Sequence, residues 1–144
     1  MGTKITFADL THTGQIVAAN TIPLGIAYVA TYAKTHLKDQ IDCEIFKYPE
    51  DFSNYLDKEL PQLACFSNFS WNIKLGHEYA KRIKELSPKT ITVFGGPNFP
   101  DKPDQQKDFL KEYPAIDFYL EYEGEKSFVE LYNELKKINF DKEK

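Results

Sequence analysis

Thr90-Ile91-Thr92-Val93-Phe94-Gly95-Gly96-Pro97 is the stretch that decides the fold of this chain. Its first five residues are β-branched or aromatic and carry no charge, which predicts a strand buried on both faces of a sheet. The two glycines that follow remove every side chain where the strand leaves the sheet. Ligands of open parallel sheets bind outside the carboxyl ends of the strands, so this exit is a candidate ligand site. A tight turn from strand to helix is the alternative interpretation.

The rest of the chain alternates predicted strands with predicted helices. Strands are expected at residues 4–10, 41–48, 62–69, 90–94 and 116–120. Helices are expected at residues 24–38, 49–60, 73–86 and 103–113, and again after residue 125. Apolar residues recur at helical spacing in the first helix, at Leu24, Ala27, Tyr28, Tyr32 and Leu37. The charged tail from Asn139 is expected to fray.

Strands that alternate with helices predict a parallel sheet with right-handed crossovers and helices on both faces. Residues 41–48 alternate apolar and charged side chains, which indicates a half-exposed edge strand. The first, third and fourth strands are more apolar, so we expect a flavodoxin-like α/β three-layer sandwich with the strand order 2-1-3-4-5. In this order, the segments 9–14, 67–72 and 95–97 should share one rim of the sheet.

The composition indicates one folded domain over residues 1–144. Hydrophobic residues make up 42% of the chain and aromatic residues 15%, which is enough for a core. The net charge of −4 and the lack of a basic run argue against binding to nucleic acid or to an anionic membrane surface. No apolar stretch is long enough to span a bilayer and no leader opens the chain, so a cytoplasmic location is expected.

Cysteine and histidine show no metal-ligand spacing, so no residue is predicted to bind a metal directly. Cys43 and Cys65 fall inside predicted strands and are expected to be free thiols packed in the core. His12, His36 and His77 are scattered along the chain. No serine with a histidine and an acid in a nucleophile-elbow context is present, which argues against independent catalysis.

Four segments of the chain resemble the cobalamin-binding domain at the amino end of cobalamin-dependent radical S-adenosylmethionine enzymes. These segments are residues 23–28, 66–72, 93–97 and 116–128. The likeness keeps the order of the family and covers nearly the whole chain. It implies a Rossmann-like domain that binds cobalamin within an enzyme of the methyltransferase type.

The resemblance also implies where the cofactor lies. The carboxyl rim of the sheet would hold the corrin, and the nucleotide tail would lie between the sheet and the neighbouring helices. Ser67 would hydrogen-bond the tail, and a side chain at Gly95 or Gly96 would collide with it. The residues expected at the cofactor are Asp9, Thr11, His12, Gly14, Leu24, Gly25, Tyr28, Ser67, Asn68, Phe69, Gly95, Gly96, Pro97, Glu121, Tyr122 and Glu123.

Two positions depart from the pattern of the family. The wider cobalamin family uses Asp-x-His-x-x-Gly, whose imidazole coordinates cobalt, whereas residues 9–14 read Asp-Leu-Thr-His-Thr-Gly. Thr11 holds the ligand position, and His12 should face the other way in an extended segment, so we expect no imidazole ligand to cobalt. Tyr122 stands where glycine is common, beside Glu123 and Glu125, which match the family. The alternative is that these acids only cap the last helix.

The chain lacks the cysteines that radical chemistry needs. The iron–sulfur cluster that activates S-adenosylmethionine requires Cys-x-x-x-Cys-x-x-Cys, and this chain has two cysteines far apart. We therefore expect it not to be catalytic alone. It would serve a separate radical S-adenosylmethionine domain, or act as a small carrier or sensor. The reaction implied by the family is methyl transfer through methylcobalamin.

Other functions share this fold. Residues 11–15 partly resemble the phosphate loop of flavodoxins, which favours flavin mononucleotide, although Ile16 stands where a hydroxyl residue is common. A receiver domain needs an acidic pair after the first strand and an Asp at the end of the third, where this chain has Asp9 alone and Ser67. A ligand-free interaction module is the third alternative, because a fold does not dictate function.

Overall fold

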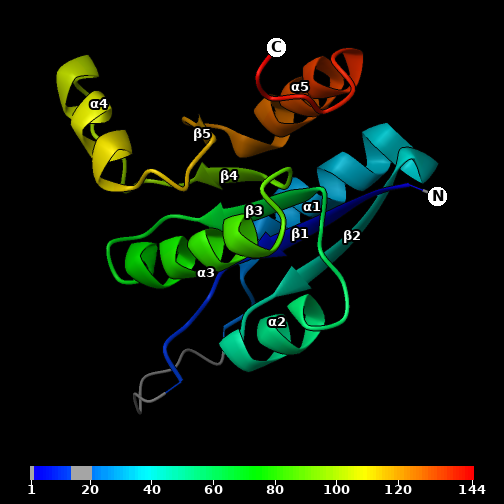
Figure 1. The fold of residues 1–144 in the computed structure, drawn as a ribbon, viewed down its shortest axis with the longest axis horizontal. Helices are drawn as coiled ribbons and strands as arrows, with labels where there is room; N and C mark the ends of the chain where they lie inside the picture. Colours follow the sequence, from blue (N-terminus) through cyan, green and yellow to red (C-terminus); the bar gives the residue numbers. More distant parts are fainter. Residues whose placement is uncertain (1, 14–20) are drawn as a thin grey trace.

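The computed structural model describes residues 2–13 and 21–144 (Figure 1). Its strands are β1 (Thr3–Ala8), β2 (Ile41–Phe46), β3 (Leu63–Ser67), β4 (Ile91–Gly95) and β5 (Phe118–Leu120). Its helices are α1 (Leu24–Leu37), the short 3-10 helix η1 (Lys38–Gln40), α2 (Pro49–Leu56), α3 (Ile73–Leu86), α4 (Pro103–Glu112) and α5 (Gly124–Lys137). None of the helices within these described ranges is long and apolar enough to cross a membrane.

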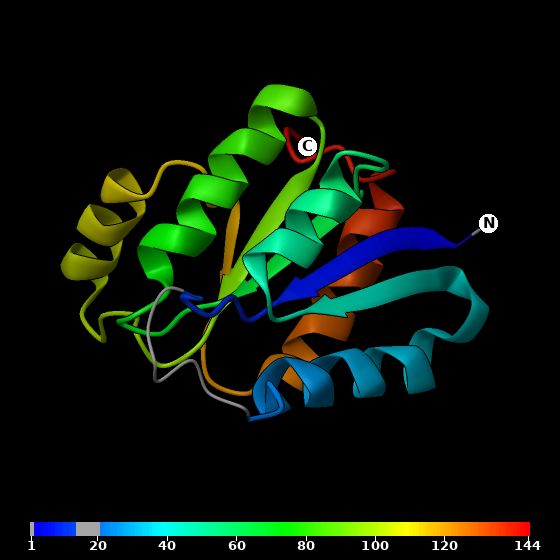
Figure 2. The same ribbon diagram turned by 90° about the horizontal axis from the view of Figure 1, so that it is seen from below.

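The strands form one parallel sheet in the order β2-β1-β3-β4-β5, which confirms the predicted flavodoxin-like α/β sandwich. Helices α1 and α5 lie on one side of the sheet, and α2 and α3 lie on the other (Figures 1 and 2). The register places Phe7 beside Cys65 and Cys65 beside Val93. Because side chains alternate along a strand, these three point to the same face, the one covered by α1 and α5.

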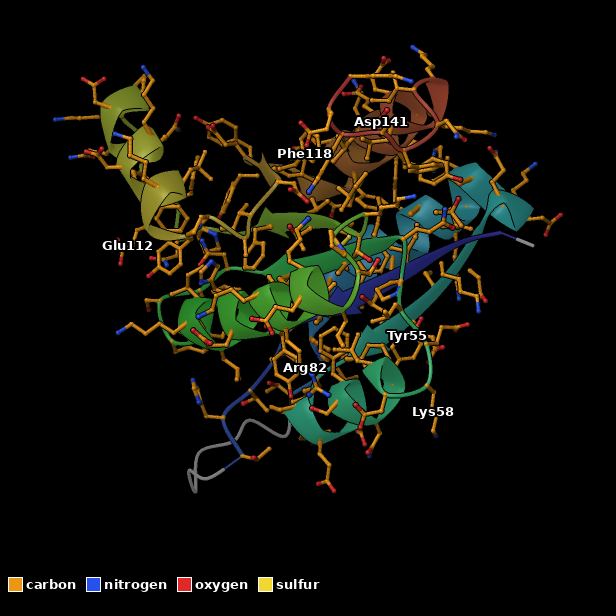
Figure 3. All side chains as sticks on the ribbon, in the orientation of Figure 1. Tyr55, Lys58, Arg82, Glu112, Phe118 and Asp141 are labelled. Atoms are coloured by element: carbon orange, nitrogen blue, oxygen red, sulfur yellow. The ribbon has the colours of Figure 1, made fainter. Side chains whose placement is uncertain are left out.

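The opposite face of the sheet carries an aromatic core. Phe66 and Phe94 stack with ring centroids 4.9 Å apart, and Phe52 of α2 meets Phe66 edge-on at 5.9 Å. At the surface of this layer, Arg82 of α3 lies toward α2 (Figure 3) and its Nη2 donates a hydrogen bond to Asp57 Oδ1 at 2.6 Å. The apolar run of each central strand thus serves two different cores, as expected for strands buried on both faces.

Helix α1 buries only part of the stripe that its sequence pattern indicates, with Leu37 buried as predicted. Its buried residues are Ile26, Ala30, Ala33 and Leu37. Leu24 and Tyr28, which belong to the predicted apolar series, are instead 57% and 58% exposed. Tyr28 is two residues from Ile26, or about 200° around the helix, so its ring faces away from the sheet.

The ends of strands and helices differ from the prediction by a few residues. β1 ends at Ala8 instead of residue 10, because its paired register stops where Ala8 meets Phe46 and Phe66. Leu10 is buried although it lies beyond the strand, so its apolar side chain does not mark the strand's end. α2 likewise ends at Leu56 rather than residue 60.

The prediction that the charged tail frays is wrong. Phe140 packs against Tyr132 of α5 with ring centroids 5.6 Å apart. Lys142 Nζ donates a hydrogen bond to Asp117 Oδ1 at 2.9 Å. A ring contact and an ion pair, both made with residues earlier in the chain, therefore hold the tail against the domain.

Asp117 immediately precedes β5, and its carboxylate is surrounded by hydrogen-bond donors. The backbone amide of Thr92 donates to its Oδ2 at 2.8 Å and the Thr92 hydroxyl at 3.1 Å. Lys84 of α3 contacts the same oxygen, and Lys142 contacts the other. Burial alone would raise the pKa of Asp117, but the hydrogen bonds from Lys84, Thr92 and Lys142 outweigh burial and hold that pKa below its ordinary value.

Both cysteines are buried free thiols, as predicted. Burial raises the pKa of the Cys43 thiol and, more strongly, that of Cys65. Because the thiolate is the reactive form, neither side chain is activated for chemistry. Cys65 nevertheless has a second role, as part of the wall of a cavity.

Candidate cofactor-binding site

A cavity of about 440 Å³ opens at the carboxyl end of the sheet. Phe7, Cys65 and Val93 from β1, β3 and β4 line it from the face of the sheet that α1 and α5 cover. Val29 of α1 and Phe128 of α5 line it from the helices. Its volume lies within the range of roughly 300–1,000 Å³ that is typical of small-molecule sites.

The predicted convergence of three distant segments on one rim is confirmed, since residues leaving β1, β3 and β4 line this same cavity. The predicted site residues in its lining are Asp9, Thr11, Leu24, Gly25, Ser67, Phe69, Gly95, Gly96, Pro97 and Tyr122. The predicted site residues outside its lining are His12, Tyr28, Asn68, Glu121 and Glu123. Gly14 lies outside the described residues.

A small hydrogen-bond network joins the first and third strands at the rim. Ser67 Oγ donates to Asp9 Oδ1 at 2.5 Å, and Asn72 Nδ2 donates to the same oxygen at 3.0 Å. Asn72 Oδ1 in turn accepts from the Phe69 amide at 2.9 Å. Because the Ser67 hydrogen is given to Asp9, the hydroxyl can meet a ligand as an acceptor.

The two glycines after β4 differ in what a side chain would meet. A Cβ at Gly95 would stand 3.4 Å from the Leu120 carbonyl oxygen, which is ordinary contact. A Cβ at Gly96 would stand 2.5 Å from the Asn68 carbonyl oxygen, and its φ is +137°. The backbone therefore requires glycine at Gly96 whether or not a ligand is present, whereas Gly95 has room for a side chain in the free protein. Sequence reasoning treated the two positions alike, and the structure separates them.

This difference predicts opposite results for two identical substitutions. Gly96→Ala should lower the free energy of unfolding by about 2–4 kcal/mol, because it adds a backbone clash to a φ that L residues rarely adopt. Gly95→Ala should change it by less than about 1 kcal/mol. Urea unfolding followed by circular dichroism measures both. Equal stabilities of the two variants would contradict the assigned backbone conformation at Gly96.

Asn68 is buried by the protein itself. Its Nδ2 donates to the Asn98 carbonyl oxygen at 2.8 Å and to the Tyr119 hydroxyl at 2.9 Å. Its Oδ1 accepts from Asn98 Nδ2 at 3.1 Å. The side chain thus fastens the loop after β4 to β5, and it has turned away from the cavity that Phe69, its neighbour, lines.

Thr11 and His12 lie on opposite sides of their segment, as the one-residue displacement predicts. Thr11 lines the cavity and His12 does not. The His12 Nε2 is 2.8 Å from the backbone oxygen of Trp71, so the imidazole is engaged outside the cavity. The structure therefore places Thr11, and not His12, in the lining of the cavity.

The loop between β5 and α5 brings one of its predicted residues to the cavity. Tyr122 lines it, whereas Glu121 lies outside and accepts a hydrogen bond from Gln106 Nε2 at 3.1 Å. Glu123 precedes α5 without a side-chain cap hydrogen bond. Glu125 lines the cavity from the first turn of α5, where a negative charge interacts favourably with the helix dipole.

Sequence reasoning missed the inner walls of the cavity. Phe7, Cys65, Val93 and Phe128 line the cavity and are buried, and none of them is among the residues expected at the cofactor. A residue can belong to the core and to a cavity wall at once, and apolar periodicity does not distinguish the two. The available signal was positional: Phe7, Cys65 and Val93 all lie near the carboxyl ends of central strands.

The described residues contain no group of three or more His, Cys, Asp or Glu side chains that could hold a metal ion. Besides apolar side chains and glycines, the cavity lining contains the polar or charged side chains of Asp9, Thr11, Thr21, Lys47, Ser67, Tyr122 and Glu125. That donor set suits an organic cofactor with a large apolar part.

Comparison with known proteins adds independent information. A family model described as the B12 binding domain matches residues 14–132. The cobalamin-dependent radical SAM methyltransferase TokK of Streptomyces tokunonensis is 35% identical over 71 residues, which are 49% of this chain and 10% of that protein. The 2-(S-pantetheinyl)-carbapenam-3-carboxylate methyltransferase of Streptantibioticus cattleyicolor matches with the same identity and coverage. The match thus spans about a tenth of the length of these relatives.

Solved structures with the same fold include two receiver domains. The BeF3-activated DrrB receiver domain has a TM-score of 0.60 and 19% identity, covering 94% of this chain and 99% of that one. The CheY-like response regulator receiver domain from Methanospirillum hungatei JF-1 has a TM-score of 0.61 and 13% identity, with full coverage of both chains. At these identities the likeness concerns the fold alone. Since the family match runs from residue 14 to residue 132 of 144, the chain belongs to the B12-binding domain family.

Proposed function

We propose that this chain binds cobalamin, with the nucleotide tail in the cavity and the corrin across the rim above it. The observation that carries the proposal is the cavity itself, which opens at the carboxyl end of the sheet between the sheet and helices α1 and α5. At about 440 Å³ it is too small for a whole cobalamin but suits the tail. The macrocycle would then rest outside, on the segments that follow β1, β3 and β4.

The residues present fit such a cofactor. The walls of the inner cavity are apolar, which suits the aromatic base of the tail. At the mouth, Phe69 and Trp71 stack with ring centroids 4.5 Å apart and present flat apolar surface. Gly95 leaves bare backbone beside Ser67, whose hydroxyl can accept a hydrogen bond. Ser67, Gly95 and Phe69 are the residues that we expect to touch the cofactor most closely.

The chain would act as one domain, residues 1–144, within a larger methyltransferase system. Cobalamin, when bound, supplies a carrier for the methyl group. The radical S-adenosylmethionine step needs a cluster held by three closely spaced cysteines, and this sequence has only Cys43 and Cys65. A separate catalytic domain or protein would therefore hold the cluster and S-adenosylmethionine. The names of the matched relatives support this assignment.

The direct test is retention of the cofactor. The chain is incubated separately with hydroxocobalamin and with flavin mononucleotide, desalted, and examined by visible spectroscopy. We expect corrin bands to remain and flavin bands to be lost. Trp71 is the only tryptophan, is 63% exposed and lies at the cavity, so its fluorescence should be quenched in a saturable manner by hydroxocobalamin. Retained flavin, or retention of neither compound, would refute the proposal.

The position of His12 predicts the coordination of the bound cofactor. Because Thr11 faces the cavity and His12 is engaged with the Trp71 carbonyl, no imidazole should coordinate cobalt. The electron paramagnetic resonance spectrum of the cob(II)alamin form should be the same in the wild type and in His12→Ala. Nitrogen coupling present in the wild type and absent from His12→Ala would show that this expectation is wrong.

A further inference from the structure

Tyr122 has a backbone conformation that its place in the fold does not explain. Its φ is +60°, in the left-handed region that large side chains seldom occupy. The other described residues with positive φ that are not glycine are Lys38, Asn139 and Phe140. All three follow the end of α1 or α5, where a left-handed residue commonly terminates a helix. Tyr122 instead lies between β5 and the start of α5.

The ring of Tyr122 makes no contact that would offset this strain. It is 91% exposed, and the next most exposed large hydrophobic side chain in the described residues, Ile22, is 77% exposed. Neither a hydrogen bond nor a ring contact joins it to another residue within residues 2–13 and 21–144. In the free protein, therefore, a glycine would serve this position better than tyrosine does.

The location of Tyr122 indicates what could bury it. Besides the main cavity, it lines a second hollow of about 370 Å³, whose other residues include Phe99, Asp101 and Glu121. Gly96 and Pro97 likewise line both spaces. Tyr122 thus stands on the boundary between the main cavity and the second hollow. A ligand that extends from one toward the other must pass its ring.

We propose that Tyr122 is a ligand-contact residue whose ring packs against the part of the corrin that extends from the main cavity toward the second hollow. This inference rests on the proposed function. The main cavity is too small for a whole cobalamin, and in the proposed arrangement the macrocycle lies over the rim where Tyr122 stands. A tyrosine ring offers a large, rigid apolar surface with few torsions to restrict, which suits contact with a flat macrocycle.

The proposal predicts that one substitution, Tyr122→Gly, raises the thermal stability of the free protein and weakens its binding of hydroxocobalamin. Tyr122→Gly relieves the positive φ and should raise the thermal midpoint of the free protein by about 2–4 °C. The same change removes the ring and should weaken hydroxocobalamin binding by about tenfold or more. Binding is measured by quenching of Trp71 fluorescence and stability by thermal circular dichroism. A purely structural residue would move binding and stability in the same direction.

Two control variants test whether the aromatic ring of Tyr122 causes the loss of affinity. Tyr122→Phe keeps the ring and the strained backbone, so its affinity should stay within about threefold of wild type and its thermal midpoint within about 1 °C. Tyr28→Ala removes an exposed tyrosine of α1 that faces away from the cavity, and its affinity should match the wild type. Loss of affinity in Tyr28→Ala equal to that in Tyr122→Gly would overturn the proposal.

The outcomes separate this inference from the function on which it rests. If the wild type retains hydroxocobalamin and Tyr122→Gly binds it equally well, the role of Tyr122 is refuted and the proposed function stands. If the wild type does not retain hydroxocobalamin, both are refuted. A higher midpoint together with weaker binding in Tyr122→Gly, and neither effect in Tyr28→Ala, supports the contact.

Discussion

Replacing Gly95 with leucine is expected to weaken cobalamin binding by roughly 10–100-fold while the protein stays folded. Gly95 and Val93 are two residues apart in β4, so their side chains would share the face of the sheet that lines the cavity. Overfilling a packed site costs about 1–3 kcal/mol, and each 1.4 kcal/mol corresponds to a tenfold change in affinity. Retention of hydroxocobalamin after desalting measures the effect.

A size series at the same position provides the control. Gly95→Ala, Gly95→Val and Gly95→Leu should lose affinity in that order, because each adds more volume to the same space. Their circular dichroism spectra should match the wild type, since a Cβ at Gly95 stands 3.4 Å from the nearest atom and the larger side chains would extend on the face of β4 that lines the cavity. Wild-type affinity in Gly95→Leu would mean that the tail does not pass this glycine. Gly96 cannot serve in this test, because its variants disturb the backbone of the free protein.

Replacing Asp117 with alanine is expected to cost about 2–4 kcal/mol of folding free energy. The change leaves Lys84, whose side chain is 19% exposed, without its carboxylate partner, and it removes the acceptor of the Thr92 amide. It also removes the acceptor of Lys142 and so one of the two contacts that hold the tail. Urea unfolding gives the difference. As a matched control, Asp57→Ala breaks the exposed pair with Arg82 and should cost less than about 1 kcal/mol.

The same carboxylate predicts how stability depends on pH. The pKa of Asp117 is held below its ordinary value of 3.8, so near that pH the unfolded chain binds more protons at this site than the folded protein does. Its contribution is therefore fully present above pH 3.8 and is lost as the pH falls through the lower, folded pKa. The stability difference between wild type and Asp117→Asn should be constant between about pH 5 and pH 7 and shrink below pH 3.8. A difference that does not change down to pH 2 would contradict the lowered pKa.

The strand order could be predicted because it depends on patterns that short stretches carry. A charged alternation marks β2 as an edge, and uncharged runs, rich in apolar residues, mark β3 and β4 as central. The face of α1 could not be predicted in the same way. Apolar residues occur on both sides of this helix, and the predicted apolar series included Tyr28 but not Ile26. Packing against α5 and the sheet selected Ile26.

The candidate site was also predictable only in part. Loop positions after the strands were predictable because parallel strands bring their carboxyl ends to one edge, and Asp9, Ser67 and Gly95 meet there. The directions of the Asn68 and Phe69 side chains were not predictable in this way. Asn68 and Phe69 are neighbours, yet Asn68 is satisfied by Asn98 and Tyr119 while Phe69 lines the cavity.

The amino-acid sequence alone established the parallel sheet, its strand order and the edge at which a ligand would bind, since these follow from the local alternation of apolar runs, glycines and helix signals. It also established that the chain lacks the three closely spaced cysteines that hold the iron–sulfur cluster of radical S-adenosylmethionine enzymes. The inner cavity walls, the turned-away Asn68 and the requirement for glycine at Gly96 came from the three-dimensional packing. The physical reason is that each of these features depends on atoms of residues far away in the chain, so no local sequence pattern indicates it.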